Sequence, residues 1–161
     1  MTRVVMEMSL IEAAHLTSLV EQFAALLEDS GAASTDPAVA RLVPDAYSDD
    51  PEAAEEFRRL TQADLLGRRG ADAAVVLATL LQDGQRLTPT GIVIGSEADP
   101  LIIDLDSDQT AAWLRTLTSL RLVLASRLGI ASEDDHDDDP RFGIYDWLGY
   151  RLDALVRALD G

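Results

Sequence analysis

The stretch TAAWLRTLTSLRLVLASRLG, residues 110–129, decides the fold because it is the most strongly patterned segment of the chain. At the helical period its large apolar side chains share one face: Trp113, Leu117, Leu120, Leu124 and Leu128. Leu114 widens this face beyond Arg121, so several neighbouring elements must bury it rather than one partner helix. We therefore predict a central core helix over residues 108–128.

The segments on either side predict further helices and a few short strands. Residues 3–8 alternate in a way that is typical of a half-buried strand, and Ser9 with Glu12 forms a capping box that starts a helix at Leu10. Asp50 followed by Pro51 predicts a second helix start. Apolar periodicity predicts helices near 10–29, 51–67, 71–83 and 143–159. The β-branched runs at 91–95 and 101–105 predict a hairpin, which we expect the N-terminal strand to join.

These elements define the expected architecture. The fold class is mainly α: a helical bundle, single-domain over residues 1–161, with a small antiparallel β-sheet of about three short strands. The acidic run EDDHDDD at 133–139 predicts a solvated linker over about 131–141 inside this domain. Calcium binding is the functional alternative for the run, but the spacing and the glycine of an EF-hand are missing.

Composition narrows the classes of function. The formal net charge is -16 over 161 residues, which opposes attraction to nucleic acid and to anionic membranes. Cysteine is absent, so disulfides and thiolate metal sites are excluded. No stretch approaches the apolar length of a membrane span, and the first residues do not resemble a signal peptide. We expect a cytoplasmic protein that contacts no membrane and does not bind nucleic acid directly.

Motifs for enzyme chemistry are missing from the sequence. It contains no phosphate-binding glycine loop, no nucleophile elbow and no zinc-binding histidine pair. Its many carboxylates are expected on the surface of so acidic a chain, so no pair of them defines a glycosidase site. We therefore predict no catalytic residues, no cofactor and no metal, and a protein that is not an enzyme.

Charged residues in or beside apolar helical faces predict a structural charge network. Asp64 falls within the apolar face of the 51–67 helix, and Arg121 lies beside that of the central helix. An isolated buried charge costs several kcal/mol, so each needs a partner. Arg68 can serve Asp64 locally, and we predict that Arg121 pairs with an acid from the region 49–64. The predicted network comprises Asp49, Asp50, Glu56, Arg58, Arg59, Asp64, Arg121 and Arg127.

Two flanks combine apolar side chains with arginine and few acids. Leu122 points away from the central stripe, and Trp147 and Arg151 lie one turn apart on the last helix, where a cation–π contact is expected. Tryptophan and arginine are enriched at binding hot spots. We predict that Leu122, Trp147 and Arg151 form an interaction surface for a second copy or a regulatory partner. The alternative is that the chain's own loops cover both flanks.

Three segments carry a resemblance to a known family: RLVPDAYSDDPEAAEEFRRLT (41–61), AAWLRTLTSLRLVLASRLGI (111–130) and IYDWLGYRLDALVRAL (144–159). They resemble an actinobacterial family of domains of unknown function, and the resemblance spans nearly the whole chain. Genes of that family often lie near the Clp protease adaptor. A branch of it is described as oxidative-stress-sensing transcriptional regulators that work with RNA polymerase sigma factors.

The resemblance implies a regulatory, protein-binding role. We expect a protein-interaction module in transcriptional or stress regulation, with a partner such as a sigma factor or RNA polymerase, or a homo-oligomer. The alternatives are a Clp-linked adaptor or structural partner, and a small enzyme. The chain departs from the family at Thr118 and Ser119, where Asn-Asp is usual, and sensing through a disulfide is excluded because cysteine is absent.

Overall fold

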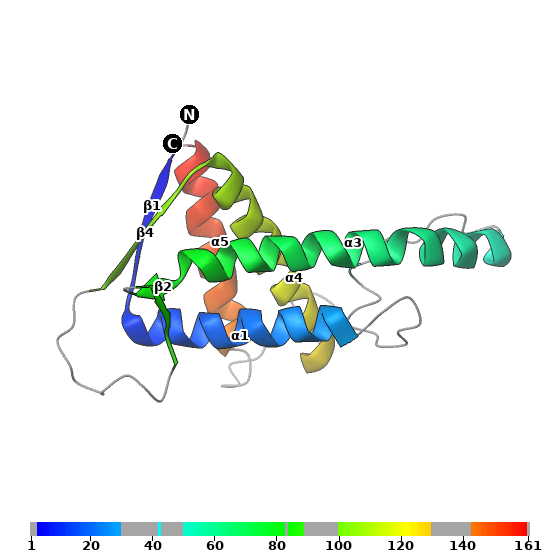
Figure 1. Ribbon diagram of the computed structural model, residues 1–161, viewed down its shortest axis with the longest axis horizontal. Helices are drawn as coiled ribbons and strands as arrows, with labels where there is room; N and C mark the ends of the chain where they lie inside the picture. The colour runs from blue at the N-terminus through cyan, green and yellow to red at the C-terminus, as the bar shows by residue number, and fades with distance from the viewer. Residues whose placement is uncertain are drawn as a thin grey trace.

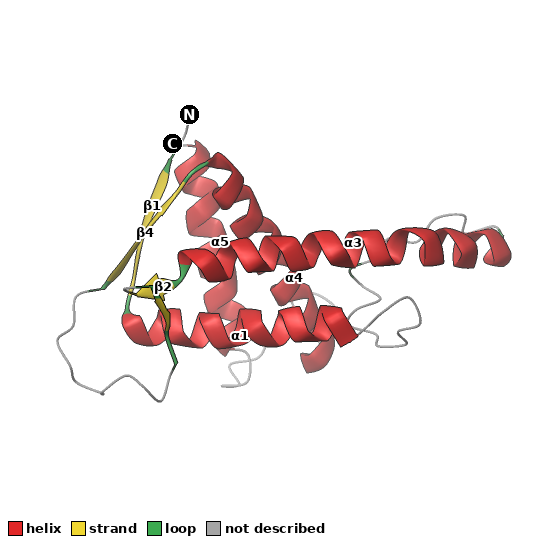
Figure 2. Cartoon of the chain, viewed as in Figure 1, coloured by secondary structure: helices red, strands yellow, loops and turns green. Residues whose placement is uncertain are grey.

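The protein is mainly helical with a small antiparallel β component, as predicted, and its described strands form two-stranded sheets rather than one sheet of three (Figures 1 and 2). The structure, a computed structural model, describes residues 3–29, 42, 50–82, 84–88, 100–129 and 143–160. The helices are α1 (Leu10–Asp29), α3 (Pro51–Thr79), α4 (Ser107–Leu128) and α5 (Gly143–Asp160). The strands are β1 (Val4–Met8), β2 (Leu81–Gln82), β3 (Gln85–Arg86) and β4 (Leu101–Leu105).

Helix α4 is the predicted central helix, and its ends are set by local hydrogen bonds. Asp106 is the N-cap: its carboxylate accepts from the backbone N–H of Gln109 at 2.8 Å, and the Gln109 side chain accepts from the N–H of Asp106 at 2.9 Å. Gly129 ends the helix with a left-handed φ of 74°. Between these caps, α4 packs against α1, α3, α5 and β4.

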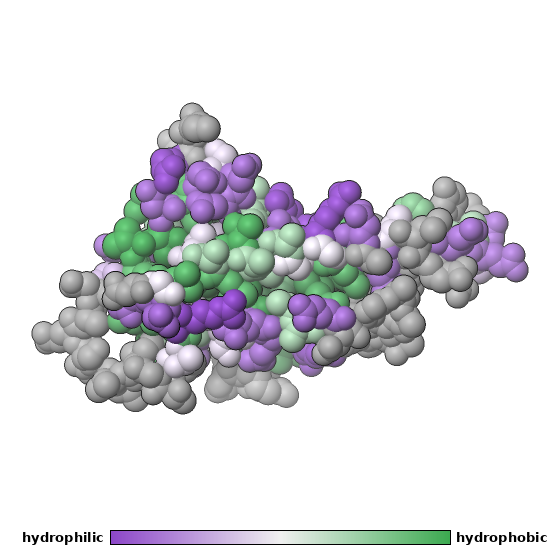
Figure 3. Space-filling model, viewed as in Figure 1, coloured by the Kyte–Doolittle hydropathy of each residue, from purple (hydrophilic) through white to green (hydrophobic). Residues whose placement is uncertain are grey.

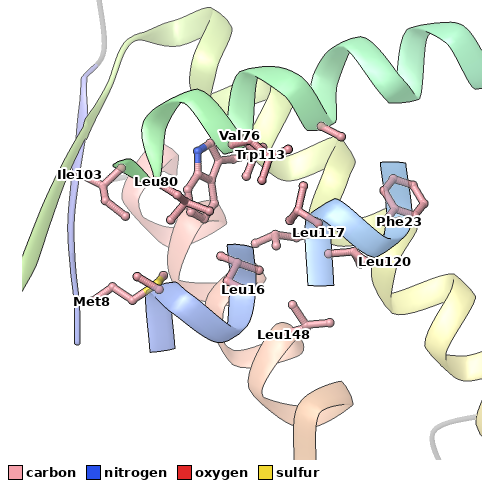
Figure 4. Close-up of a cluster of buried hydrophobic side chains, with 14 of the residues drawn as sticks. Met8, Leu16, Phe23, Val76, Leu80, Ile103, Trp113, Leu117, Leu120 and Leu148 are labelled. Atoms are coloured by element: carbon pink, nitrogen blue, oxygen red, sulfur yellow. The ribbon is translucent and has the colours of Figure 1, made fainter. Parts of the chain in front are cut away.

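The core forms where these neighbours meet α4. Trp113 and Leu117 are fully buried, and side chains from α1, α3, α5 and β4 converge on them (Figure 4). The indole N–H of Trp113 donates to Oγ1 of Thr79 at 2.8 Å, so the one polar atom of the tryptophan is satisfied across the α3–α4 contact. Leu124 and Leu128 are only half-buried, because they lie in the last turns of α4.

Helix α3 corrects the predicted division into 51–67 and 71–83. It runs unbroken through Gly67 and Gly70 and ends at Thr79. Glycine inside a helix lowers the stability of the helix but does not end it, and the contacts of α3 with α1 and α4 outweigh this loss. The predicted start is confirmed, since the Asp50 carboxylate accepts from the N–H groups of Glu52 and Ala53 at 3.2 Å. In Figure 1, α3 extends well past the end of α1.

One strand pairing agrees with the prediction, and a second pairing was not predicted. β1 and β4 are antiparallel, with Val4 opposite Leu105 and Met8 opposite Leu101, so the N-terminal strand does join 101–105. Residues 81–82, predicted as the end of a helix, instead form β2, which pairs with β3, and Gly84 between the two strands has a φ of 77°. The predicted strand 91–95 and the acidic linker 131–141 lie outside the described residues.

Helix α1 overturns the expectation that no segment reaches the length of a membrane span. Residues 10–28 are long enough, with a mean hydropathy of 1.2. The most buried side chains of α1 lie in the core of the fold, including Leu16, Val20 and Phe23. This hydrophobicity is therefore what packing against α3 and α4 requires.

Removing the Leu117 side chain should test whether the α4 face organises the core. Leu117 is fully buried, so Leu117→Ala should lower the free energy of unfolding by about 2–5 kcal/mol. Ile102 is 55% exposed on β4, and Ile102→Ala should change it by only about 0.5 kcal/mol. Urea unfolding followed by circular dichroism measures both. Equal effects of the two changes would contradict a core centred on α4.

Candidate interaction surfaces

The Trp147–Arg151 flank, predicted as open surface, contacts α1 and β1. The Trp147 indole N–H donates to Oε2 of Glu12 at 3.0 Å, and Nη2 of Arg151 donates to the same oxygen at 2.6 Å. Nη1 of Arg151 also donates to the backbone carbonyl of Glu7 at 3.2 Å. The Arg151 side chain is only 16% exposed. The flank therefore holds α5 against the first turn of α1, and Trp147 also lines a surface groove; its role as an interaction surface stays a prediction.

The expected cation–π contact is present within this cluster. The Arg151 guanidinium lies 5.7 Å from the centre of the Trp147 ring. Burial by itself would raise the pKa of the Glu12 carboxyl, but the hydrogen bonds from Arg151 and Trp147 outweigh it and lower that pKa. The folded state therefore favours the carboxylate form of Glu12. Leu122, the third predicted surface residue, is half-buried on α4.

Asp64, predicted to fall within an apolar helical face, is exposed and has the local partner that the sequence offered, while the wider charge network stays a prediction. Asp64 lies on the exposed side of α3, with a side chain 64% exposed, and it pairs with Arg68 one turn on at 3.1 Å. It needs no internal partner, because water reaches its carboxylate. Asp50 serves as the N-cap of α3, and Glu56 is exposed. Asp49 and the side chains of Arg58 and Arg59 lie outside the described part of the chain.

Arg121 lies against α5. Its guanidinium stacks 4.0 Å from the centre of the Tyr145 ring, and its Nε donates to the backbone carbonyl of Tyr145 at 3.4 Å. Gly149 makes room for it, since a Cβ there would lie 2.9 Å from Nη2 of Arg121. Its pairing with an acid of the region 49–64 stays a prediction. Arg127 is exposed in the last turn of α4.

A charge cluster that the sequence did not reveal joins α3 to α4. The Asp72 carboxylate accepts from Nε and Nη2 of Arg115 at 2.9 and 3.0 Å, and from Nη1 of Arg69 at 3.2 Å. The hydrogen bond from Arg115 is the main cause of a lowered pKa for the Asp72 carboxyl. The pairing of Asp72 with Arg69, three residues earlier on the same helix, could have been predicted from the sequence, but the pairing with Arg115 depends on how the two helices cross.

Helix α1 borders two grooves in the described part of the chain. The smaller, about 480 Å³, lies between α1 and the first turns of α5 and is mostly apolar; its lining includes His15, Leu19, Ile144 and Trp147. The larger, about 700 Å³, lies between α1 and α3 and ends at Arg86 of β3. On the face shown in Figure 3, hydrophobic residues follow α3 and the seam below it, and hydrophilic residues border them on the side of α1.

The larger groove has a floor of small and aliphatic residues and a charged border. Its apolar lining comes from both helices: Ala24, Ala25, Leu27, Leu66, Gly67, Gly70, Ala74 and Leu77. Glu21 and Glu28 border it on α1, and Glu21 lies 3.6 Å from Arg86. Among the described residues, no group of three or more acidic, histidine or cysteine side chains could hold a metal ion. The groove is suited to contact with another apolar surface.

The architecture is that of a mainly helical protein built around one central helix, with an apolar groove on one face. A family model for a domain of unknown function, DUF2017, matches residues 1–159, and the chain belongs to this family. No curated protein and no solved structure matches the chain.

The Glu12 cluster should make stability depend on pH. Because the folded pKa of Glu12 is lowered, its contribution is present above the unfolded pKa and is lost as pH falls through the folded pKa. Glu12→Gln should therefore flatten the fall in unfolding free energy between about pH 5 and pH 3. Glu28→Gln, at the other end of α1, is the matched control. Thermal melts across this range that show the same slope for Glu12→Gln and wild type would disprove the role of Glu12.

Three glycines inside helices should respond differently to alanine. A Cβ on Gly67 or Gly70 would meet no atom within 4 Å, so each change to alanine should raise the free energy of unfolding by about 0.5–1 kcal/mol. Gly149→Ala should raise the free energy of unfolding by less, because the new Cβ must displace the Arg121 guanidinium from Tyr145. Urea denaturation compares the three variants, and an equal gain at all three positions would mean that Arg121 does not depend on Gly149.

Proposed function

We propose that this chain is a non-enzymatic protein-interaction module that acts in transcriptional or stress regulation through a protein partner. The observation that carries the proposal is the α1–α3 groove of about 700 Å³, which has an apolar floor and an acidic border on α1. Protein interfaces commonly have an apolar centre and a polar rim, and the lining of this groove has that arrangement. The polar groups at this groove are carboxylates and one arginine at its border.

The resemblance to an actinobacterial regulator branch supports the choice of partner. A sigma factor or RNA polymerase is the partner of the proposed function, and a Clp component is the alternative that gene neighbourhood suggests. The net charge of -16 favours a partner with a basic contact surface and disfavours direct contact with nucleic acid. A cytoplasmic location is part of the proposal, since both kinds of partner act there.

Affinity capture from an actinobacterial lysate tests the function. The tagged full chain should retain a sigma factor or RNA polymerase, identified by mass spectrometry, and the purified partner should then bind the purified chain in biolayer interferometry. Retention should fall with rising salt, because the expected contact is electrostatically assisted. Retention of Clp components alone would favour the adaptor alternative. If purified sigma factor and polymerase do not bind, the proposed role in transcription is wrong.

A further inference from the structure

Packing against the described residues does not explain two glycines in the α1–α3 groove. Gly67 and Gly70 lie inside α3, outside the left-handed region, and a Cβ on either would meet nothing within 4 Å. Each costs about 0.5–1 kcal/mol relative to alanine in a helix. Gly149 is the contrast, because the Arg121 side chain occupies the space that its missing Cβ leaves. At Gly67 and Gly70 that space is open and belongs to the groove.

The groove fits a helix better than an extended peptide. Its two long walls are helices, whose backbone groups are hydrogen-bonded within each helix, so an extended strand would find no edge to pair with. A helix satisfies its own backbone. The α3 wall from Gly67 to Leu77 is about 15 Å long, or about three helical turns. Without side chains at Gly67 and Gly70, an entering helix can approach α3 closely.

The charged residues at the border of the groove favour an incoming helix with basic side chains. Glu21 and Glu28 stand two turns apart on the α1 border, and Arg86 lies at the end of the groove beside Glu21. A second copy of the chain would bring its own net charge of -16 to this acidic border, and the repulsion opposes self-association. A basic flank on an incoming helix would instead meet the carboxylate of Glu28, and it would share the carboxylate of Glu21 with Arg86.

We propose that the α1–α3 groove binds an amphipathic helix of a partner protein. Small or apolar side chains of that helix pack over Gly67 and Gly70, and its Arg or Lys residues face Glu21 and Glu28. The inference rests on the proposed function, because it supplies the partner surface of a protein-interaction module.

Peptide display on the intact chain tests the proposal. A library of peptides of about 15 to 18 residues, patterned for helix formation and varied in charge and in the apolar face, is selected against the immobilised protein. The enriched peptides are then measured by fluorescence anisotropy against wild type, against Gly67→Leu combined with Gly70→Leu, and against Glu28→Arg. Ala154→Leu combined with Ala158→Leu, two exposed positions on α5, is the matched control.

The expected result is enrichment of basic amphipathic helices. They should bind the double glycine variant roughly tenfold more weakly or worse, bind Glu28→Arg more weakly, and bind the α5 control like wild type. Circular dichroism and thermal melting should show that all variants stay folded, since a Cβ at Gly67 or Gly70 meets no described atom within 4 Å and the side chain points into the groove. The proposal would be overturned if no peptides were enriched, if the enriched peptides were acidic, or if they bound the double glycine variant as tightly as wild type. A wild-type dimer that the same variant dissociates would assign the groove to a second copy and overturn it as well.

Failure of this inference can be separated from failure of the proposed function. If the double glycine variant still captures the regulatory partner from lysate as wild type does, the function stands and the groove is not its site. If the selected peptides bind the groove but no sigma factor or polymerase is captured, the helix-binding site stands and the role in transcription fails.

Discussion

The broad apolar face of α4 has to be covered on several sides at once, and the rest of the fold is arranged around that need. Trp113 and Leu117 cannot be buried by one neighbour, so α1, α3, α5 and β4 all meet α4. Trp113 also carries a polar N–H into the core, and Thr79 at the end of α3 accepts its hydrogen bond. The end of α3 is therefore tied to the same contact that fills the core.

Charged side chains then connect the helices in pairs, each in a different way. The Asp72 carboxylate on α3 accepts hydrogen bonds from Arg115 on α4, and the Glu12 carboxylate on α1 accepts one from Arg151 on α5. Between α4 and α5, Arg121 stacks on the ring of Tyr145. The acceptors of the first two pairs are partly shielded from water, where a charge-assisted hydrogen bond is stronger than on the open surface. In an excess of acids, these arginines are used largely for internal contacts. That leaves a surface whose remaining charge is mostly negative.

The α1–α3 seam differs from the contact between α4 and α5. At α4–α5 the Arg121 side chain occupies the space beside Gly149, whereas at the α1–α3 seam glycine and alanine line a groove that is open to solvent. Cores are packed to high density and helices disfavour internal glycine, so an open seam built from small residues is costly for the isolated chain. A contact with another protein is the physical reason that we propose for it.

The sequence by itself determined the local structure. The periodic face of residues 108–128, the capping signals at Ser9 and Asp50, and the alternating residues 3–8 all act over a few residues, so their helices and strand could be predicted. The same reasoning failed at 67–71, where tertiary contacts keep the helix continuous through its glycines. It failed again at 81–82, which pair with 85–86 as strands instead of ending a helix.

Only the tertiary structure decided which residues meet across elements. Nothing in the local pattern of Asp72 or Glu12 indicates Arg115 or Arg151, because those pairings depend on helix crossing and rotation. Trp147 and Arg151 show the same limit: their shared flank follows from the helical period, but their hydrogen bonds to Glu12 follow from the position of α5 beside α1. The groove is likewise visible only when α1 and α3 lie together, since small residues define a hollow through what surrounds them.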